Sequence, residues 1–563
     1  RLDPAERSVL ECAAVEGEVQ LNAAGPGSPP GTAESYYHFI LGYREELNSR
    51  LDLARDKYSA AVQGDPKSAF LLTRLASLLV RQGNMERAEE LARRAVALDA
   101  QETQAYLILG GIYTARGKLN EAVEVYEKLL RLKPAENEVK LLLGTAYLEL
   151  GRNQEAVDVL EKVAKGERGD VLGQFYLAQG YVRLRKYDEA ERELLRLAEQ
   201  HPQFTRGLLA LGGLHEVRSN FGKAEEVYKR ILSYEPENRE ARARLGQVYI
   251  RKENLEGALK EYERLSQEEP GNLDVHRTLG FLRFERRNFQ EALREFRFVL
   301  ARNPKDEAVR RFVAAIYEEL EQPAQAEKEL DELIALVPAT VEGRIQLARL
   351  FAKGESFEKA FAALEEAAKA HPKDARIPFA RGSILMRQKK YAESVPFFEA
   401  SIQLDSKSTL YRFNLASAYY ELKRWDFVEA ETREILRMDP RHANALNLLG
   451  YMFSERNKNI LEAEQLLDRA LAIEPTNPAF LDSLAWVYYR QGRFKEALGK
   501  LTHALNQQPD DPVMLDHLGD IHLSLGDKGK ALEAWRKSFK ADPKSAEVEE
   551  KIRRHEPSGQ RAR

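Results

Sequence analysis

The chain has 563 residues, of which 43% are hydrophobic and 31% are charged, with a formal net charge of -4 and a sequence pI near 6.3. This near-neutral charge argues against nucleic acid as the main partner, because phosphate binding requires a basic excess. The single cysteine, Cys12, excludes an internal disulfide framework, and no apolar run approaches the ~18 residues of a membrane span.

The amino-terminal stretch differs in composition from the rest of the chain. Residues 1–22 predict one short helix or none, and residues 23–33 (AAGPGSPPGTA) predict a flexible spacer because they are rich in glycine and proline. We therefore expect residues 1–34 to form an N-terminal segment and linker. The chain begins at Arg1 rather than Met, which leaves room for membrane anchoring through a lost lipidated N-terminus, although Glu11 before Cys12 fits a lipoprotein cleavage site poorly.

A pattern of 34 residues repeats from residue 35 to residue 545. Each unit contains a tiny residue, with an aromatic or other bulky residue three positions later and, in most units, a proline near the end. The turn at residues 457–461 holds one extra residue. The tiny residue is glycine or alanine in all fifteen units, at Gly42, Ala76, Gly110, Gly144, Ala178, Gly212, Gly246, Gly280, Ala314, Ala348, Gly382, Ala416, Gly450, Ala485 and Gly519.

Each unit predicts two amphipathic helices. In the fourth unit, Gly144 and Tyr147 share one face of a first helix, and Ala156 and Leu160 share one face of a second, by the 3.6-residue period. A glycine inside a helix costs about 1 kcal/mol relative to alanine. We expect packing to offset this cost, because a missing side chain lets the two helix backbones approach closely where they cross.

These units resemble the tetratricopeptide repeat, whose small residues, aromatics and proline occupy the same places in a 34-residue unit. The resemblance covers about nine tenths of the chain. It implies an all-α fold: an α-solenoid, wound as a right-handed superhelix of about fifteen helix–turn–helix units over residues 35–545. Residues 546–563 predict a polar capping helix, AEVEEKIRRH, followed by a frayed tail.

No catalytic motif is visible along the chain. The patterns HExxH, GxxxxGK[ST], GxSxG and CxxC are all absent, so we expect neither catalysis nor a bound cofactor. The strongest metal-like group is Asp516, His517, Asp520 and His522. The two histidines fall on different helix faces, so this pattern favours structural roles over a metal site, with His522 in the buried aromatic position.

The wall of the superhelix is the candidate partner-binding surface. The resemblance implies that the second, fifth, ninth, twelfth and thirteenth positions of each first helix line a concave groove. In the middle of the array these positions are charged, at Arg277, Arg311, Glu318, Glu319, Arg349 and Lys353. In the last third they hold the predicted contact residues Arg376, Phe379, Arg387, Phe413, Tyr420, Asn444, Asn447, Tyr451, Trp486, Tyr489 and Arg490.

Arginine and aromatic side chains are the usual anchors of protein interfaces, and Asn444 and Asn447 are placed to hydrogen-bond the backbone of an extended peptide. The competing interpretation, for Tyr451 in particular, is packing against the neighbouring repeat. The lysine–asparagine pattern of the carboxylate clamp in chaperone-binding relatives is absent.

The first functional hypothesis is a non-catalytic scaffold or adaptor that holds a protein or peptide in the groove. The array is similar to long bacterial tetratricopeptide proteins of Gram-negative envelopes, some of which are lipoproteins that recruit a processing protease. That resemblance favours a periplasmic or outer-membrane location over a cytoplasmic one. The alternatives are the regulatory or targeting region of an enzyme such as a glycosyltransferase, and a self-assembling structural array.

Overall fold

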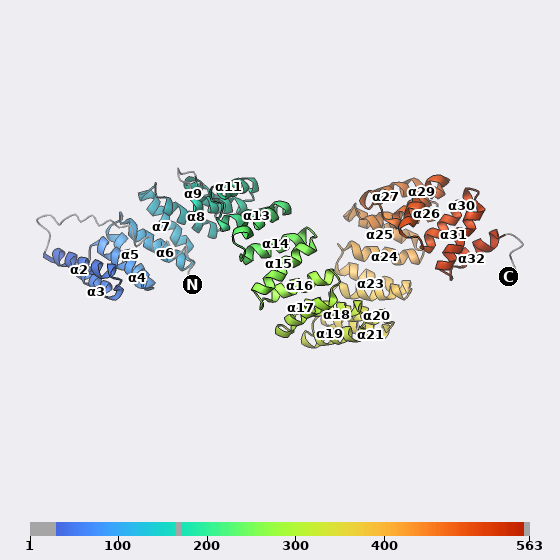
Figure 1. The fold of residues 1–563 in the computed structure, drawn as a ribbon, viewed down its shortest axis with the longest axis horizontal. Helices are drawn as coiled ribbons and strands as arrows, with labels where there is room; N and C mark the ends of the chain where they lie inside the picture. The colour runs from blue at the N-terminus through green and yellow to red at the C-terminus, as the bar shows by residue number, and fades with distance from the viewer. Residues whose placement is uncertain (1–29, 165–169, 557–563) are drawn as a thin grey trace. The chain divides into compact units, whose positions relative to one another are not determined.

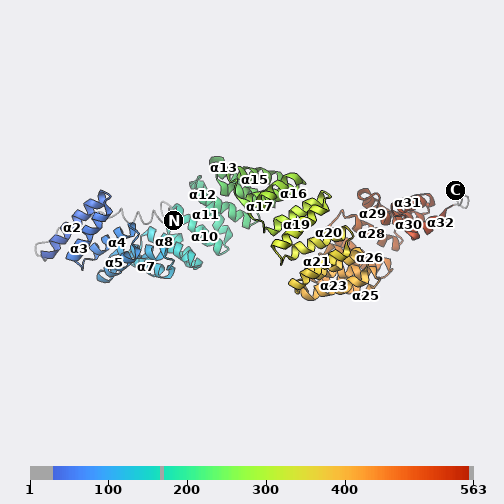
Figure 2. The same ribbon diagram turned by 90° about the horizontal axis from the view of Figure 1, so that it is seen from below.

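The computed structural model describes residues 30–164 and 170–556, which form 31 helices and no strand. By its internal packing the chain divides into two compact units, residues 1–282 (unit 1) and residues 283–563 (unit 2). Within each unit, most helices pack against the next one in the chain, as α18 does on α19 and as α4 does on α5 in both views (Figures 1 and 2). The predicted all-α solenoid of helical hairpins is confirmed.

The helices of the first part are α2 (Pro30–Leu47), α3 (Leu51–Gly64), α4 (Ala69–Arg81), α5 (Met85–Leu98), α6 (Thr103–Ala115), α7 (Leu119–Leu132), α8 (Asn137–Glu149), α9 (Asn153–Ala164), α10 (Val171–Arg183), α11 (Tyr187–Gln200), α12 (Thr205–Val217), α13 (Phe221–Tyr234), α14 (Arg239–Arg251), α15 (Leu255–Glu268) and α16 (Leu273–Glu285).

The remaining helices are α17 (Phe289–Arg302), α18 (Glu307–Glu319), α19 (Pro323–Leu336), α20 (Val341–Lys353), α21 (Phe357–Ala370), α22 (Arg376–Arg387), α23 (Tyr391–Leu404), α24 (Thr409–Glu421), α25 (Trp425–Met438), α26 (Ala443–Glu455), α27 (Ile460–Ile473), α28 (Pro478–Arg490), α29 (Phe494–Gln507), α30 (Pro512–Ser524), α31 (Lys528–Ala541) and α32 (Ala546–His555). Even-numbered helices from α2 to α30 are the first helix of a repeat (helix A), and odd-numbered helices are the second (helix B).

The tiny residue of helix A makes room for a large side chain of helix B. A Cβ added at Gly144 would lie 2.5 Å from Leu160 Cδ2, and one added at Gly382 would lie 2.8 Å from Phe398 Cε1. Leu160 and Phe398 are fully buried. At Gly144 the three atoms nearest to an added Cβ all belong to the side chain of Leu160, so the space left by the missing side chain is filled from helix B.

The turn between helix A and helix B uses a left-handed residue. In the fourth repeat this residue is Gly151, with a φ of 75°, and the next residue, Arg152, donates its N–H to the carbonyl of Tyr147 at 2.9 Å. This closes the end of α8 in the manner of a Schellman motif. At the equivalent place Lys389 has a φ of 59° without being glycine.

Polar contacts join consecutive repeats. The Tyr147 hydroxyl donates to Glu127 Oε1 of the preceding helix B at 2.7 Å, and Tyr181 donates to Glu161 Oε1 at 2.7 Å in the next repeat. Burial and the neighbouring carboxylate together raise the pKa of Tyr147, so the phenol stays a donor. Each of these repeats thus contacts its neighbour through hydrogen bonds as well as through its core.

The ends of the array differ in how far the sequence predicted them. The first helix of the described residues, α2, begins at Pro30, so the last residues of the predicted spacer are helical, whereas residues 1–29 and the tail after residue 556 lie outside the described residues. Helix α32 covers residues 546–555 and packs Val548 and Ile552 with Trp535 of α31. None of the helices in the described part of the chain is long and apolar enough to cross a membrane.

Candidate binding surface on unit 2

The A helices of unit 2 carry all eleven predicted contact residues. These residues come from α22, α24, α26 and α28, and we call the surface formed by side chains of α18 to α30 the A-helix wall. Two pockets open on this wall, one over α18 to α24 and one toward α32. The predicted residues fall into two groups around these pockets.

The larger pocket, the arginine pocket, has a volume of about 690 Å³. Of the predicted residues it contains Arg376 and Phe379, whose ring centroid lies 4.9 Å from that of Tyr411. Arg376 Nη2 donates to Asp374 Oδ2 at 2.6 Å and the guanidinium also pairs with Glu342. The residues lining the pocket are Arg311, Phe312, Ala315, Glu318, Glu342, Ile345, Gln346, Arg349, Arg376, Phe379, Leu410 and Tyr411.

Two arginines of this pocket have guanidinium groups without an ion pair in the part of the chain that the structure describes. Among the described residues, neither Arg311 of α18 nor Arg349 of α20 makes an ion pair or a side-chain hydrogen bond, and Arg311 Nε is buried without a partner. The two carboxylates of the pocket are already satisfied, because Glu318 accepts from Gln346 Nε2 at 3.2 Å and Glu342 pairs with Arg376. The pocket therefore presents unpaired positive charge beside aromatic rings.

A strip of aromatic side chains follows the arginine pocket along the wall. The Tyr420 hydroxyl donates to Glu455, and its ring centroid lies 6.3 Å from that of Tyr451. Burial, with the charge of Glu455 next in weight, raises the pKa of Tyr451. Arg490 Nη2 donates to the backbone carbonyl of Glu455 at 3.4 Å. The strip thus leads into the second pocket, the C-terminal pocket, which has a volume of about 360 Å³ and is also lined by Trp486.

Trp486 lies inside a stack of rings rather than on an open surface. Its ring centroid is 4.6 Å from Tyr489 and 4.1 Å from His517, both nearly parallel to it, and only 9% of the residue is exposed. The Arg490 guanidinium lies 5.1 Å from the indole centroid. Trp486 therefore packs between repeats, whereas Tyr489 is half-buried and Arg490 is exposed.

His517 is held by a carboxylate from the preceding repeat. Its Nδ1 lies 2.8 Å from Asp482 Oδ1, and both side chains are buried. Burial lowers the pKa of His517, but the charge and hydrogen bond of Asp482 outweigh it and raise the pKa overall. The expectation that His522 fills the buried position was wrong: His522 is only half-buried, and His517 is the buried histidine.

The carboxylates beside His517 are bound by the last helix. Lys551 Nζ of α32 lies 2.8 Å from Asp516 Oδ2 and 2.9 Å from Asp520 Oδ2. Within residues 30–164 and 170–556, no group of three or more His, Cys, Asp or Glu side chains is arranged to hold a metal ion. These acidic groups therefore anchor α32 to α30.

The other predicted contact residues vary in exposure. Arg387 and Asn444 are exposed, and Phe413 is half-buried with its ring centroid 5.7 Å from that of His442. Asn447 is half-buried, and its Oδ1 has no hydrogen-bond partner. This oxygen is itself buried, so a ligand backbone would reach it only after the side chain turns outward.

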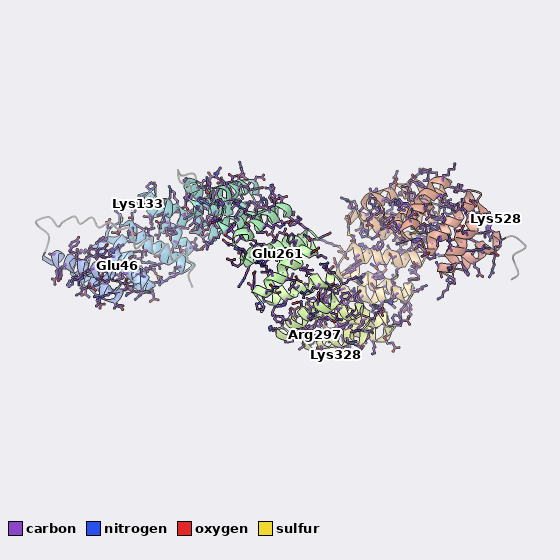
Figure 3. All side chains as sticks on the ribbon, viewed as in Figure 1. Glu46, Lys133, Glu261, Arg297, Lys328 and Lys528 are labelled. Atoms are coloured by element: carbon purple, nitrogen blue, oxygen red, sulfur yellow. The ribbon has the colours of Figure 1, made fainter. Side chains whose placement is uncertain are left out.

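A third pocket, on the face carried by α17 and α19, has a different character. It has a volume of about 400 Å³ and includes Arg297 and Lys328 (Figure 3). Its arginines and glutamates satisfy one another: Arg297 Nη2 donates to Glu329 Oε1 at 3.0 Å, and Arg310 Nη1 donates to Glu329 Oε2 at 3.0 Å. Since these groups are paired internally, this pocket offers less to a ligand than the arginine pocket does.

Sequence reasoning missed several residues of the A-helix wall. Phe312, Gln346 and Tyr411 line the arginine pocket from the third and sixth positions of their helices, which the repeat rule assigns to packing. Leu410 stands at the second position and is 53% exposed, so the rule itself would have included it. The signal that could have found Phe312 and Tyr411 is that each is a large side chain directly after Arg311 or Leu410 in the sequence.

The hairpin stack and the repeated glycine–aromatic fit define the class of protein as an α-solenoid of helix–turn–helix repeats. Three family models, each described as tetratricopeptide repeat, match the chain. The first matches residues 113–174, 218–282, 283–350 and 456–521. The second matches residues 73–137, 175–233, 345–409 and 429–478, and the third matches residues 514–545. The chain belongs to the tetratricopeptide repeat family, as the sequence resemblance predicted. Repeats of this family are protein–protein interaction scaffolds.

Similar proteins match only parts of the chain. A TPR repeat-containing protein of Pseudomonas aeruginosa is 27% identical over 173 residues, covering 31% of this chain and 23% of its own length. A protein O-mannosyl-transferase of Homo sapiens is 29% identical over 154 residues, covering 27% of this chain and 16% of its own length. The chain thus spans less than a quarter of these two relatives.

Solved structures that are similar include the Cut9–Hcn1 hetero-tetramer of the APC/C, at 13% identity and a TM-score of 0.40, covering 86% of this chain and 96% of that one. YrrB, described as a TPR protein with an unusual peptide-binding site, is 23% identical with a TM-score of 0.30, covering 33% of this chain and 95% of that one.

Proposed function

We propose that this protein is a non-catalytic scaffold that binds an extended segment of a partner protein along the A-helix wall of unit 2. The observation that carries the proposal is the arginine pocket, where Arg311 and Arg349 are unpaired beside the rings of Phe312 and Phe379. Unengaged arginines next to aromatic side chains are typical of interface anchors.

The aromatic strip supports the proposal because it extends the candidate site along the A-helix wall beyond the arginine pocket. Tyr420, Tyr451 and Tyr489 are half-buried and follow the arginine pocket along α24, α26 and α28. The unpartnered amide oxygen of Asn447 lies in the same helix as Tyr451. An extended polypeptide that runs along the wall would meet charge first, and then rings and amide groups.

Site-specific photo-crosslinking tests this proposal. A photoreactive amino acid is placed at Leu410 on the wall, or at Phe427 on helix B of the same repeat; these residues are 53% and 54% exposed. In extracts of the source cells we expect a protein cross-linked from Leu410 and not from Phe427. Equal labelling from both positions, or labelling from Phe427 alone, would contradict binding at the wall.

A finer part of the proposal is recruitment of a protease or of assembly machinery in a bacterial envelope. It is supported by the resemblance to envelope arrays and by the similarity to the Pseudomonas aeruginosa protein. Fractionation of the source cells, followed by identification of the cross-linked protein, tests both the compartment and the partner class. A cytoplasmic location would contradict this part and leave the scaffold proposal unaffected.

A second candidate is that the array is the regulatory or targeting region of a glycosyltransferase. The similarity to the human O-mannosyl-transferase favours it, at 29% identity over 154 residues. Reading the complete gene decides between the two, because a transferase domain in the same reading frame would establish the second candidate. Glycosyl transfer by the purified chain itself would overturn the non-catalytic assignment.

A further inference from the structure

We propose that the arginine pocket binds side-chain carboxylates of an acidic segment that also carries a large apolar side chain. This inference rests on the proposed function, since it names the chemistry of the partner segment that the A-helix wall holds. It depends on three properties of the pocket: unpaired guanidinium groups, neutralised carboxylates and exposed apolar surface.

The first property is positive charge without internal partners. In the described part of the chain, the side chains of Arg311, Arg349, Lys353 and Arg387 form no ion pair, and all four lie on the consecutive A helices α18, α20 and α22. A buried donor without a partner, such as Arg311 Nε, is costly to leave unsatisfied. A carboxylate from a ligand would form charge-assisted hydrogen bonds with the accessible part of these guanidinium groups, since Arg311 is half-buried and Arg349 is exposed.

The second property is that the pocket's own acids do not cancel this charge. Burial alone would raise the pKa of Glu342, but its hydrogen bond and ion pair with Arg376, with a smaller addition from the charge of Arg311, outweigh burial and hold the pKa below its ordinary value. Glu318 accepts a hydrogen bond from Gln346 at 3.2 Å. Both acids are therefore bound to neighbouring side chains, whereas the guanidinium groups of Arg311 and Arg349 form no ion pair among the described residues, although the charge of Arg311 is felt by Glu342.

The third property is apolar surface next to the charge. Leu410 is 53% exposed at the edge of the pocket, and Phe379 and Tyr411 lie beside it with ring centroids 4.9 Å apart. The volume of about 690 Å³ is within the range of pockets that bury several side-chain groups. An aromatic or aliphatic side chain over α22 and α24 would be buried while a carboxylate reaches α18 and α20.

The number of unpaired cations favours side-chain carboxylates over a chain terminus. A terminal carboxylate supplies one charge at one place, whereas Arg349, Lys353 and Arg387 extend the positive surface beyond Arg311 along two further helices. An internal segment with several Asp or Glu residues can pair with more than one of them. The occupant is therefore an internal acidic segment of a partner protein.

Fluorescence anisotropy with synthetic peptides tests this assignment. The probe is a fluorescein-labelled peptide, acetylated and amidated at its ends, with Asp and Glu residues around a central Phe; the matched peptide has Asn and Gln in their place. We expect the acidic peptide to bind the full chain, more weakly as salt is raised, and the amide peptide to bind about tenfold less tightly or worse.

The protein variants are Arg349→Gln and the control Arg294→Gln, which removes the same charge from an exposed arginine on α17, a helix B. Arg349→Gln should weaken binding of the acidic peptide about tenfold, and Arg294→Gln should leave its Kd unchanged. Because both arginines are exposed, neither change disturbs the core, and circular dichroism checks the fold. Rescue of binding by Arg349→Lys would further support a charge contact.

Equal binding of the acidic and amide peptides would overturn the carboxylate assignment, and so would equal loss in the two arginine variants or failure of the acidic peptide to bind. If the acidic peptide bound only when its ends were free, the pocket would instead be assigned to a terminal carboxylate. These outcomes concern only the chemistry of the bound segment. Whether a partner protein binds at the A-helix wall at all is decided separately, by cross-linking at Leu410 and Phe427.

Discussion

The indole of Trp486 and the imidazole of His517 lie nearly parallel, with 17° between their planes and 4.1 Å between their centroids. Trp486 belongs to α28 and His517 to α30, so the stack joins two consecutive repeats. Tyr489 continues it on the other side of the indole, at 4.6 Å. A residue expected to contact a ligand is thus part of the packing between repeats.

Trp486→Ala should therefore lower stability directly. We expect a loss of about 3 kcal/mol, because truncating a buried aromatic side chain leaves a cavity in addition to the lost burial. The measurement is the midpoint of urea unfolding. The control is Arg490→Ala, whose exposed side chain also approaches the indole. A Trp486 variant with an unchanged midpoint would show that the ring is free to serve a ligand.

Gly144→Leu should destabilise the fourth repeat by roughly 1–3 kcal/mol through overpacking against Leu160. The double variant with Leu160→Ala should recover part of this loss, since the new side chain then occupies the vacated volume. Gly213→Ala is the matched control: nothing lies within 4 Å of an added Cβ there, so helix propensity should raise stability by up to about 1 kcal/mol. Thermal unfolding distinguishes the three, and equal effects at both glycines would refute the recess at Gly144.

Lys389→Gly should stabilise the turn between α22 and α23. Lys389 adopts a φ of 59°, where a side chain is strained by roughly 1–2 kcal/mol and glycine is not. The entropy lost by glycine on folding reduces the gain to about 0.5 kcal/mol. Gly492→Ala, at the equivalent turn with a φ of 77°, should have the opposite sign. Chemical unfolding measures the change in the free energy of unfolding for both variants. A change of the same sign in the two variants would contradict the explanation by backbone strain.

The Asp482–His517 pair should make stability depend on pH. Burial opposes the charged imidazole, but Asp482, with smaller additions from Asp516 and Asp520, raises the pKa of His517 in the folded chain. The contribution of the pair is therefore complete below the ordinary histidine pKa of about 6.5 and is lost as pH rises through the raised value.

His517→Gln should accordingly cost most in mild acid and progressively less at alkaline pH. The measurement is the unfolding midpoint of the wild type and the variant across that range. His503→Gln, at an exposed position, provides the control and should show no such trend. A cost that stays constant with pH would mean that the imidazole is neutral throughout and acts only by packing.

The fold could be predicted almost completely from the sequence, because a repeat presents the same pattern many times. The bounds of α32 at Ala546–His555 agree with its charge pattern and its place after the last repeat. The extra residue at 457–461 is accommodated by left-handed Asn457 and Asn459 before α27 begins at Ile460. Local rules suffice wherever neighbours in the sequence are also neighbours in space.

The candidate site was predicted less well, for a physical reason. The position of a residue in helix A predicts whether its side chain faces away from helix B, but it does not predict whether the next repeat covers that side chain. Trp486 of α28 is covered by His517, whereas Arg349 of α20 is exposed. That difference depends on side chains one repeat away in the structure. Arg311 and Arg349 stand out because their side chains form no ion pair among the described residues, and that property is visible only in three dimensions.

The recess at Gly144 and the side chain of Leu160 that fills it lie in the same 34-residue unit, as do Gly42 with Tyr58 and Gly519 with Trp535. A tandem duplication of one unit therefore copies both halves of the fit together. The new unit needs only the stacking surface that its neighbours already offer. An array built in this way lengthens or shortens by whole units without remaking its interior, so evolution can adjust its reach separately from the residues on its wall.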